Sequence, residues 1–392
     1  MNLLIYHKDD YLFRDLLDIL SRESVSYSVI PCVFTDKYED PVFWDWCMRN
    51  IDFSRYDALL AVNYHPILAR LCYKKGIKYI AWCYDCPLNV VSVEDTMAYE
   101  TNYVFLFDRQ QYQSYYNRGF RTVYHMPLGV NTHRLAGLKY SPAAEQKYSC
   151  EVGFVGNLYA SRLQEILAPM SPFSQGYLQA LMDAQFSIYG CYLLDSLLTD
   201  ELLQQINDTY REKVPDTAFV LTKEALNFAM ASEITRKERI ILLNLLGKRY
   251  NTKFYSYAPS DLIDNALYCG AVDYVTEMPF VFHYSKINLN PIMRSIQTGI
   301  PLRAFDVMGV GGFLLSSWQE ELAETYVDGE DLVLYDSIQD AIEKAAFYLS
   351  HEDIRIKIAH SGQQKTLQEH NLRNILDLML KEVFRIKVPP DV

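Results

Sequence analysis

Several patterns that identify common enzyme classes do not occur in this chain of 392 residues. It has no G-x-S-x-G and no G-x-x-x-x-G-K-[ST] sequence, which argues against a serine hydrolase of the common fold and against a P-loop nucleotidase. Its eight histidines are dispersed, and the C-x-x-C pair at 83–86 has no second pair to complete a zinc site. The sequence therefore predicts no metal site.

The chain also lacks a basic excess, since 49 acidic residues outnumber 37 basic ones and the net charge is -12. Such a charge repels a phosphate backbone and argues against general nucleic-acid binding, although it permits a local anion site. No segment reaches about 18 uninterrupted apolar residues, and the N-terminus has no basic region before a long apolar stretch. With eight scattered cysteines, which suit reduced thiols, we expect a cytoplasmic protein without a transmembrane segment.

Short apolar strands alternate with amphipathic helices in the first 150 residues. This rhythm favours a mostly parallel sheet covered by helices on both faces, with ligands at the carboxyl ends of the strands. The expected strands cover residues 3–6, 26–34, 58–62, 78–85, 103–108 and 122–130. Residues at the ends of these strands are therefore the first functional candidates: His7, Asn63, His65, Asp85, Asp108 and His125.

A second α/β series follows residues 134–149, which lose the periodicity and are expected to form a linker or a long loop. The series begins with CEVGFVGN at 150–157, and residues 158–249 are predicted to be a helical insertion. Further strands are expected at 253–257, 272–275, 285–290, 311–317 and 332–335, before helices at 338–349, 352–367 and 371–385. The order predicts a second doubly wound domain, as the length suggests.

Two glycine-containing segments resemble ligand loops. In GFVGN (153–157) a strand runs into a glycine turn, whose amides can hold a diphosphate. In GVGG (309–312) the glycines precede the apolar run, whereas a dinucleotide loop follows its strand. Neither segment has the dinucleotide fingerprint G-x-G-x-x-G. Residues 274–315 concentrate basic and polar side chains in an otherwise acidic chain. This concentration favours binding of a phosphate ligand over the alternative, a chance scatter of charges on the surface.

The C-terminal half resembles the CgeB-type (spore-maturation) branch of bacterial GT-B-fold glycosyltransferases, related to the group 1 transferases. The motifs that carry the resemblance are TEMPFVFHYSKINLN, RSIQTGIPLRAFD, GVGGFLLSSWQEELAETYVDGEDLVLY and HEDIRIKIAHSGQQKTLQEH. GFVGN, WCYDCPLN and PLGVN also resemble motifs of the family, so the resemblance extends over most of the chain, with fewer matching segments outside the C-terminal half.

The resemblance implies an α/β GT-B fold of two facing Rossmann-like, doubly wound domains. Residues 1–140 would form the acceptor-side domain and 150–370 the nucleotide-sugar domain, with the insertion at 158–249 and residues 371–392 crossing back to the first domain. It implies transfer of a sugar from a nucleotide-diphosphate sugar, with UDP favoured, to a surface glycan, protein or small molecule. No metal and no cofactor would be required, and a homo-oligomer is compatible with the sequence.

The resemblance also implies the site residues. The segment from Tyr274 to Pro279 would line the base, Asp306 would contact the ribose or phosphate region, and Lys286, Arg294 and GFVGN would address the diphosphate. The full donor set is Gly156, Asn157, Tyr274, Met278, Pro279, Ser285, Lys286, Asn290, Arg294, Arg303, Asp306, Gly311 and Gly312. If the reaction inverts configuration, Asp85 is the first candidate for the base, followed by His125 and His7.

Two departures from the family pattern leave alternatives open. Many related retaining enzymes carry two glutamates separated by seven residues, but Thr298 and Asp306 stand at these positions here. HKDD at 7–10 replaces the N-terminal glycine-rich loop. An inactive GT-B-like binding or assembly protein of a cell or spore surface layer is therefore the second hypothesis. An epimerase of the same fold, acting on the donor itself, is the third.

Overall fold

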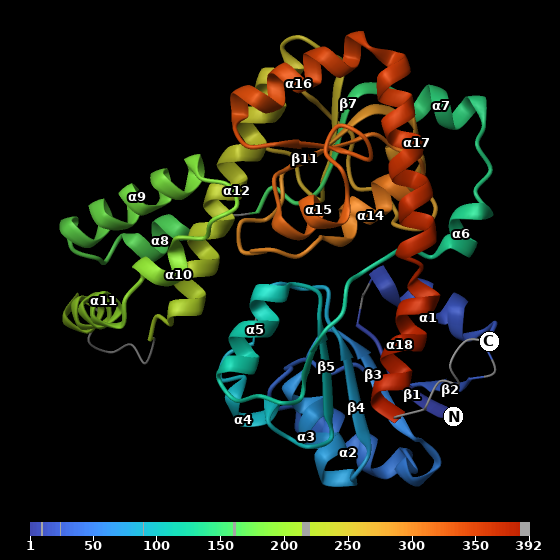
Figure 1. Ribbon diagram of the computed structural model, residues 1–392. Helices are drawn as coiled ribbons and strands as arrows, with labels where there is room; N and C mark the ends of the chain where they lie inside the picture. Colours follow the sequence, from blue (N-terminus) through green and yellow to red (C-terminus); the bar gives the residue numbers. More distant parts are fainter. Residues whose placement is uncertain (9–10, 24, 89, 160–161, 214–219, 385–392) are drawn as a thin grey trace. The chain divides into compact units, whose positions relative to one another are not determined.

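The computed structural model describes residues 1–8, 11–23, 25–88, 90–159, 162–213 and 220–384. The chain divides into two compact units (Figure 1). Unit 1 comprises Met1–Lys139, Gly299–Phe305 and Thr366–Val392, and unit 2 comprises Tyr140–Thr298 and Asp306–Lys365. Parts of three predicted segments lie outside the described residues: 9–10 of HKDD, 160–161 and 214–219 of the insertion, and 385–392 of the final segment.

Unit 1 contains a sheet of six parallel strands in the order β2-β1-β3-β4-β5-β6. The strands are β1 (Asn2–Tyr6), β2 (Ser26–Val29), β3 (Ala58–Val62), β4 (Lys78–Trp82), β5 (Asn102–Leu106) and β6 (Val123–His125). All five residues of β3 are buried, as an inner strand of a parallel sheet requires. The strand order reverses between β1 and β3, which is where doubly wound sheets bind ligands.

The helices of unit 1 begin and end at recognisable signals. Asp40 caps α2, since its carboxylate accepts a hydrogen bond from the Phe43 amide at 2.9 Å, and Gly76 ends α3 in the left-handed conformation. The last helix, α18, also belongs to unit 1, where Lys78 donates to the Val383 carbonyl. The helices are α1 (Tyr11–Leu20), α2 (Pro41–Asn50), α3 (Pro66–Lys75), α4 (Glu94–Met97), α5 (Arg109–Asn117), α6 (Thr132–Ala136) and α18 (Leu372–Phe384).

Unit 2 contains a second parallel sheet, in the order β12-β11-β10-β7-β8-β9. Its strands are β7 (Cys150–Val155), β8 (Thr252–Tyr255), β9 (Leu267–Tyr268), β10 (Ser285–Asn290), β11 (Leu314–Ser317) and β12 (Val333–Tyr335). The order reverses between β7 and β10. The accompanying helices are α7 (Pro142–Tyr148), α13 (Met278–Tyr284), α15 (Glu320–Thr325) and α16 (Ile338–Ser350), together with the larger part of α17 (Glu352–Glu369) and the second half of α14 (Leu302–Gly309).

The predicted insertion forms a helical arm with a hydrophobic core of its own. It consists of α8 (Leu163–Leu167), α9 (Pro172–Ser187), α10 (Leu194–Leu197), α11 (Asp200–Lys213) and α12 (Lys223–Gly247). Leu178, Leu194, Ile206 and Met230 belong to the arm's core, whereas Leu242 of α12 belongs to the core over the sheet. Figure 1 shows α8 to α11 gathered beside α12, to one side of the sheet of unit 2. The long helix α12 thus links the arm to the sheet.

The fold class predicted from the sequence is confirmed, whereas some local expectations are wrong. Residues 134–149 are not a long loop, because Ser141 caps α7 by accepting from the Ala144 amide at 3.2 Å. No strand forms at 272–275, because the Asp273 side chain accepts from the Val275 and Thr276 amides and makes a turn there. The second strand ends at Val29 instead of residue 34, and Pro31 has no N–H for a ladder.

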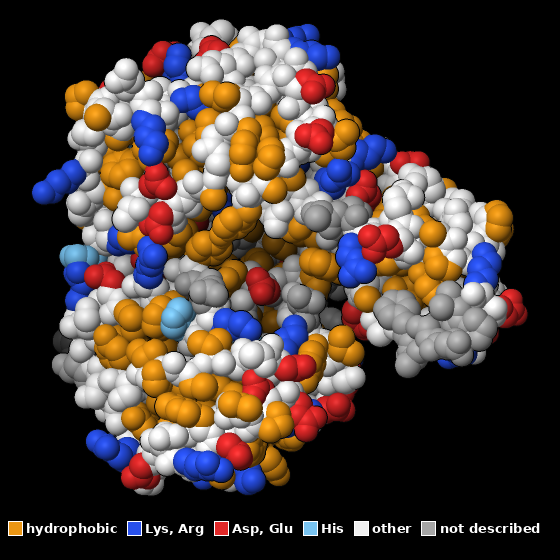
Figure 2. Space-filling model, turned by 180° about the vertical axis from the view of Figure 1, so that it is seen from behind, with side chains coloured by type: hydrophobic (Ala, Val, Ile, Leu, Met, Phe, Trp, Pro, Cys, Tyr) orange, Lys and Arg blue, Asp and Glu red, His pale blue; other side chains and the backbone are white. Residues whose placement is uncertain are grey.

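Charges of both signs are dispersed over the face of the molecule that Figure 2 draws. Figure 2 shows Lys and Arg side chains interspersed with acidic and hydrophobic ones on the face that it draws, instead of gathered in one broad basic area. Within the described ranges, no helix is long and apolar enough to cross a membrane.

Candidate functional site

Arg239 of α12 organises the reversal point of the sheet in unit 2. Its Nη1 donates to the carbonyl of Asn157, which follows β7. Its Nε and Nη2 donate to the carbonyl of Pro291, which follows β10, at 3.3 and 2.8 Å. The guanidinium carbon lies 5.4 Å from the ring centre of Phe154 and 5.0 Å from that of Tyr159. One side chain therefore joins the carboxyl ends of the two strands, and sequence analysis missed it because nothing distinguishes Arg239 from other charges on helices.

Arg294, predicted to contact a diphosphate, belongs to a buried network. Its Nη2 lies 2.9 Å from Oε2 of Glu238, which is fully buried, and its guanidinium carbon lies 3.9 Å from the ring centre of Tyr189. The hydroxyls of Tyr189 and Tyr335 both donate to Oε1 of Glu238, at 2.9 and 3.0 Å. Because a carboxylate compensates its charge, Arg294 offers little positive potential to a ligand, and its predicted role stays a prediction.

The structure brings together two predicted donor residues that are far apart in sequence. The hydroxyl of Tyr274 donates to Oδ1 of Asp306 at 3.0 Å, and both side chains are buried. Met278 and Pro279 are buried at the start of α13, a few residues after Tyr274. Arg303 lies one turn before Asp306 on α14. Tyr274 and Asp306 therefore lie in contact, and their role in donor binding stays a prediction.

The carboxyl ends of β10 and β11 are also tied together. The Asn290 side-chain amide donates to the Ser316 hydroxyl at 3.0 Å, and the Ser317 hydroxyl accepts from the Ile292 amide at 2.9 Å. A small cavity beyond these strand ends is lined in part by Arg294. Asn290 thus lies on the same sheet edge as Gly156 and Asn157, which follow β7.

Four predicted donor residues lie at the opposite edge of this sheet. Ser285 and Lys286 begin β10, and Gly311 precedes β11, so in a parallel sheet all three lie at the amino ends of the strands. A Cβ on Gly312 would lie 2.8 Å from the Phe282 carbonyl and from the Asn288 side chain, so packing alone explains that glycine. The structure therefore separates these four residues from Asn157 and Arg294 instead of grouping them as predicted.

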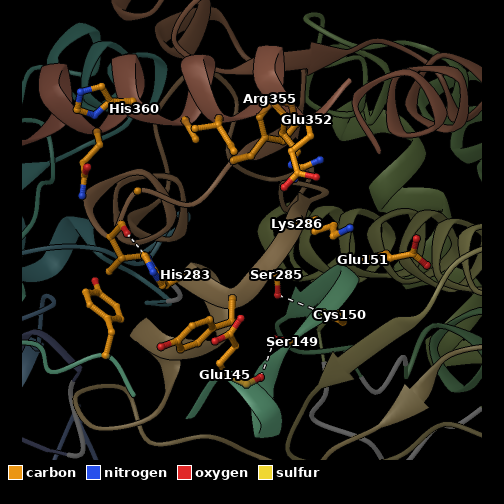
Figure 3. A pocket seen from close by; sticks show the side chains of 18 of the residues that line it. Glu145, Ser149, Cys150, Glu151, His283, Ser285, Lys286, Glu352, Arg355 and His360 are labelled. Atoms are coloured by element: carbon orange, nitrogen blue, oxygen red, sulfur yellow. Dashed lines mark hydrogen bonds and ion pairs between the residues drawn. The ribbon is translucent and has the colours of Figure 1, made fainter. Parts of the chain in front are cut away.

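A cavity of about 720 Å³ lies at this amino edge. Figure 3 shows Lys286 and Glu151 at the starts of adjacent strands, with Glu352 and Arg355 of α17 across from them. Arg355 is buried and lies 3.4 Å from Glu352. Both charge signs line the cavity, and its position is not the one at which doubly wound sheets bind nucleotides.

In unit 1, Asn63 fixes the position of Asp85 beside the reversal point of the sheet. Asn63 follows β3 in the left-handed conformation, with φ 63°. Its Oδ1 accepts from the amides of Tyr84 and Asp85 at 3.0 and 3.1 Å, and its Nδ2 donates to Oδ2 of Asp85 at 2.9 Å. Desolvation raises the pKa of the Asp85 carboxyl, against the opposing charge of Lys37. A carboxyl group with a raised pKa suits a general base.

The two other base candidates occupy different places in the sheet of unit 1. His7 follows β1 at the reversal point and stacks on Phe13 at 3.8 Å, and its buried Nδ1 has no hydrogen-bond partner among the described residues. His125 ends β6, the edge strand, with Nε2 3.3 Å from the Phe107 carbonyl. Only Asp85 and His7 therefore adjoin the reversal point. Across the described residues, no group of three His, Cys, Asp or Glu side chains is arranged to hold a metal ion.

Comparisons with known proteins agree with this architecture. Residues 226–381 match a family described as glycosyl transferase-like. No curated protein matches the sequence.

The solved structures similar to this chain include three nearly full-length matches. Anabaena Alr3699/HepE in complex with UDP and glucose is 11% identical, with a TM-score of 0.52 over 98% of this chain and 100% of that one. Thermosynechococcus elongatus sucrose-phosphate synthase is 10% identical, with a TM-score of 0.53 over 98% of each chain. A UDP-forming α,α-trehalose-phosphate synthase from Burkholderia xenovorans is 12% identical, with a TM-score of 0.51 over 99% of each.

At these identities the structural likeness shows the fold, which is GT-B, and the family match is confined to residues 226–381. The CgeB branch is not distinguished from other glycosyltransferases. The chain therefore has the GT-B fold, and its residues 226–381 match a glycosyl transferase-like family.

Proposed function

We propose that the chain transfers a sugar from a UDP-sugar to an acceptor, with the donor bound at the carboxyl edge of the sheet in unit 2. The observation that carries the proposal is the reversal point between β7 and β10, where polar backbone and side-chain groups converge. UDP is favoured because one structure of the same fold is a complex with UDP and glucose and another is a UDP-forming synthase.

In this proposal the diphosphate lies beside the Gly156–Asn157 turn, and Asp306 contacts the ribose or phosphate region. Tyr274, Met278 and Pro279 line the base. The bond between the anomeric carbon and a phosphate oxygen breaks, and its electron pair leaves with the diphosphate. Cationic side chains and backbone amides stabilise that charge, so that no metal is required.

An acceptor hydroxyl forms the new bond. If the configuration inverts, the proton of that hydroxyl passes to a base, and Asp85 is the proposed base because Asn63 fixes its position and its pKa is raised. If the configuration is retained, the leaving diphosphate accepts the proton. The proposed acceptor is a surface glycan, a protein or a small molecule, and the proposed location is the cytoplasm.

Isothermal titration calorimetry with UDP, CDP and ADP, followed by a UDP-release assay with UDP-glucose, tests the proposal. We expect UDP to bind most tightly. Asp306→Asn keeps an oxygen that accepts from Tyr274 but removes the charge, and we expect it to weaken UDP binding by about 10-fold or more, since a hydrogen bond to a charged group contributes about 1.5–3 kcal/mol. Asp264→Asn, at an exposed carboxylate of unit 2, is the matched control. Absence of binding by every nucleoside diphosphate would overturn the proposal.

A further inference from the structure

Arg239 is a buried cation without an acidic partner. Its side chain is 8% exposed, and in the described parts of the chain no carboxylate lies within ion-pair distance of it. Buried arginines are usually paired, because an uncompensated charge is costly to desolvate. The neighbouring buried arginine, Arg294, follows this rule with Glu238 at 2.9 Å. Arg239 therefore calls for a different explanation.

The partners that Arg239 does have leave its charge in place. Its three hydrogen bonds go to the carbonyls of Asn157 and Pro291, which are dipoles without net charge. A guanidinium has five N–H groups, so two remain for a further acceptor. The rings of Phe154 and Tyr159 lie against the guanidinium group and restrict its movement. The result is a fixed guanidinium that keeps its positive potential.

The charge of Arg239 lies at the reversal point of the sheet in unit 2. Asn157 and Pro291 follow the two strands between which the order of the sheet reverses. The crevice outside such strand ends is the place where doubly wound sheets bind anionic nucleotide groups. An arginine fork also matches the oxygens of a phosphate group.

We propose that Arg239 binds the diphosphate of the donor and stabilises the leaving group as the glycosidic bond breaks. The identification of the anion as a donor diphosphate rests on the proposed function. When the bond between the anomeric carbon and the phosphate oxygen breaks, the electron pair goes to that oxygen. Arg239 contributes hydrogen bonds and positive charge to that oxygen.

A purely structural clamp between β7 and β10 is the competing explanation, and the diphosphate distinguishes the two. The experiment compares the affinities of the full chain for UDP and for uridine, which lacks the phosphates, in wild type, Arg239→Met and Arg239→Lys. Arg236→Met is the matched control, because Arg236 lies on the same helix and pairs with Glu233 at 3.4 Å.

We expect Arg239→Met to weaken UDP binding by about 10- to 100-fold, as for loss of a hydrogen bond to a charged group, and to leave uridine binding within about twofold. Arg239→Lys, which keeps the charge, should retain part of the UDP affinity, and Arg236→Met should change neither ligand. An equal loss of UDP and uridine affinity, or no loss of UDP affinity, would overturn the proposal.

Inorganic pyrophosphate separates this proposal from the proposed function. If the wild type binds no UDP, the proposed function fails, but the anion site is still tested. Pyrophosphate that binds the wild type and not Arg239→Met would support the site. Pyrophosphate that binds neither protein, or both equally, would overturn it.

Discussion

The buried ion pair between Glu238 and Arg294 gives a large stability effect. Glu238→Ala removes the carboxylate that compensates a 9% exposed guanidinium, and it removes the acceptor of the Tyr189 and Tyr335 hydroxyls. Removing one partner of a buried pair costs about 3–5 kcal/mol, because the other charge stays buried and uncompensated. We therefore expect the free energy of unfolding to fall by about 4 kcal/mol.

Urea denaturation followed by circular dichroism measures this change through the transition midpoint. Glu233→Ala, which removes a partly exposed partner of Arg236 on the same helix, should cost less than about 1 kcal/mol. The double variant Glu238→Met with Arg294→Met should lose less stability than the sum of the losses in Glu238→Met and Arg294→Met alone, since two apolar side chains leave no buried charge. A cost of Glu238→Ala below about 1 kcal/mol, or full additivity in the double variant, would refute the reasoning.

Three further predictions concern single residues. Burial lowers the pKa of His65 to about 4, whereas the unfolded chain binds the proton near pH 6.5. The neutral side chain therefore contributes its full stabilisation above about pH 6.5, and about 3 kcal/mol of the free energy of unfolding is lost as the pH falls towards 4. His65→Asn should flatten the dependence of the urea midpoint on pH. Gly153→Ala should destabilise the protein by about 1–3 kcal/mol through overpacking, because the new Cβ would lie 2.2 Å from the Ser285 hydroxyl. The Cβ of Gly176→Ala on α9 would meet nothing within 4 Å, so this variant should stabilise the protein by up to about 1 kcal/mol in thermal unfolding. If Asp85 is the base, sugar transfer should rise with pH through its raised pKa, and Asp85→Asn should remove that rise while UDP affinity by calorimetry stays unchanged.

Sequence periodicity predicted those strands and helices whose bounds depend on burial and on their own terminal residues. The strand at 58–62 and the helix at 66–75 have the predicted bounds, because ALLAV is an inner strand and Pro66 and Gly76 mark the two ends of the helix. The extent of α7 was missed although Ser141–Pro142 is a capping signal. Local patterns therefore sufficed where a segment's own residues determine its structure.

The site was harder to predict, because it depends on which ends of the strands meet. Lys286 and Asn290 are close in sequence, yet they lie near opposite ends of β10, and a strand of that length spans about 17 Å. Arg239 and Glu238 read as ordinary helix charges, and only the tertiary structure shows that both are buried. Tyr274 and Asp306 were predicted from the family resemblance, and their hydrogen bond became visible only in the fold.

Hydrogen–deuterium exchange of the full chain with and without UDP tests most directly whether the donor binds at the carboxyl edge of the sheet in unit 2. The account predicts slower exchange of backbone amides in 155–159 and 292–296, which follow β7 and β10, and unchanged exchange in 283–286 and 310–313 at the amino edge. Protection confined to the amino-edge segments, with none at 155–159, would contradict it.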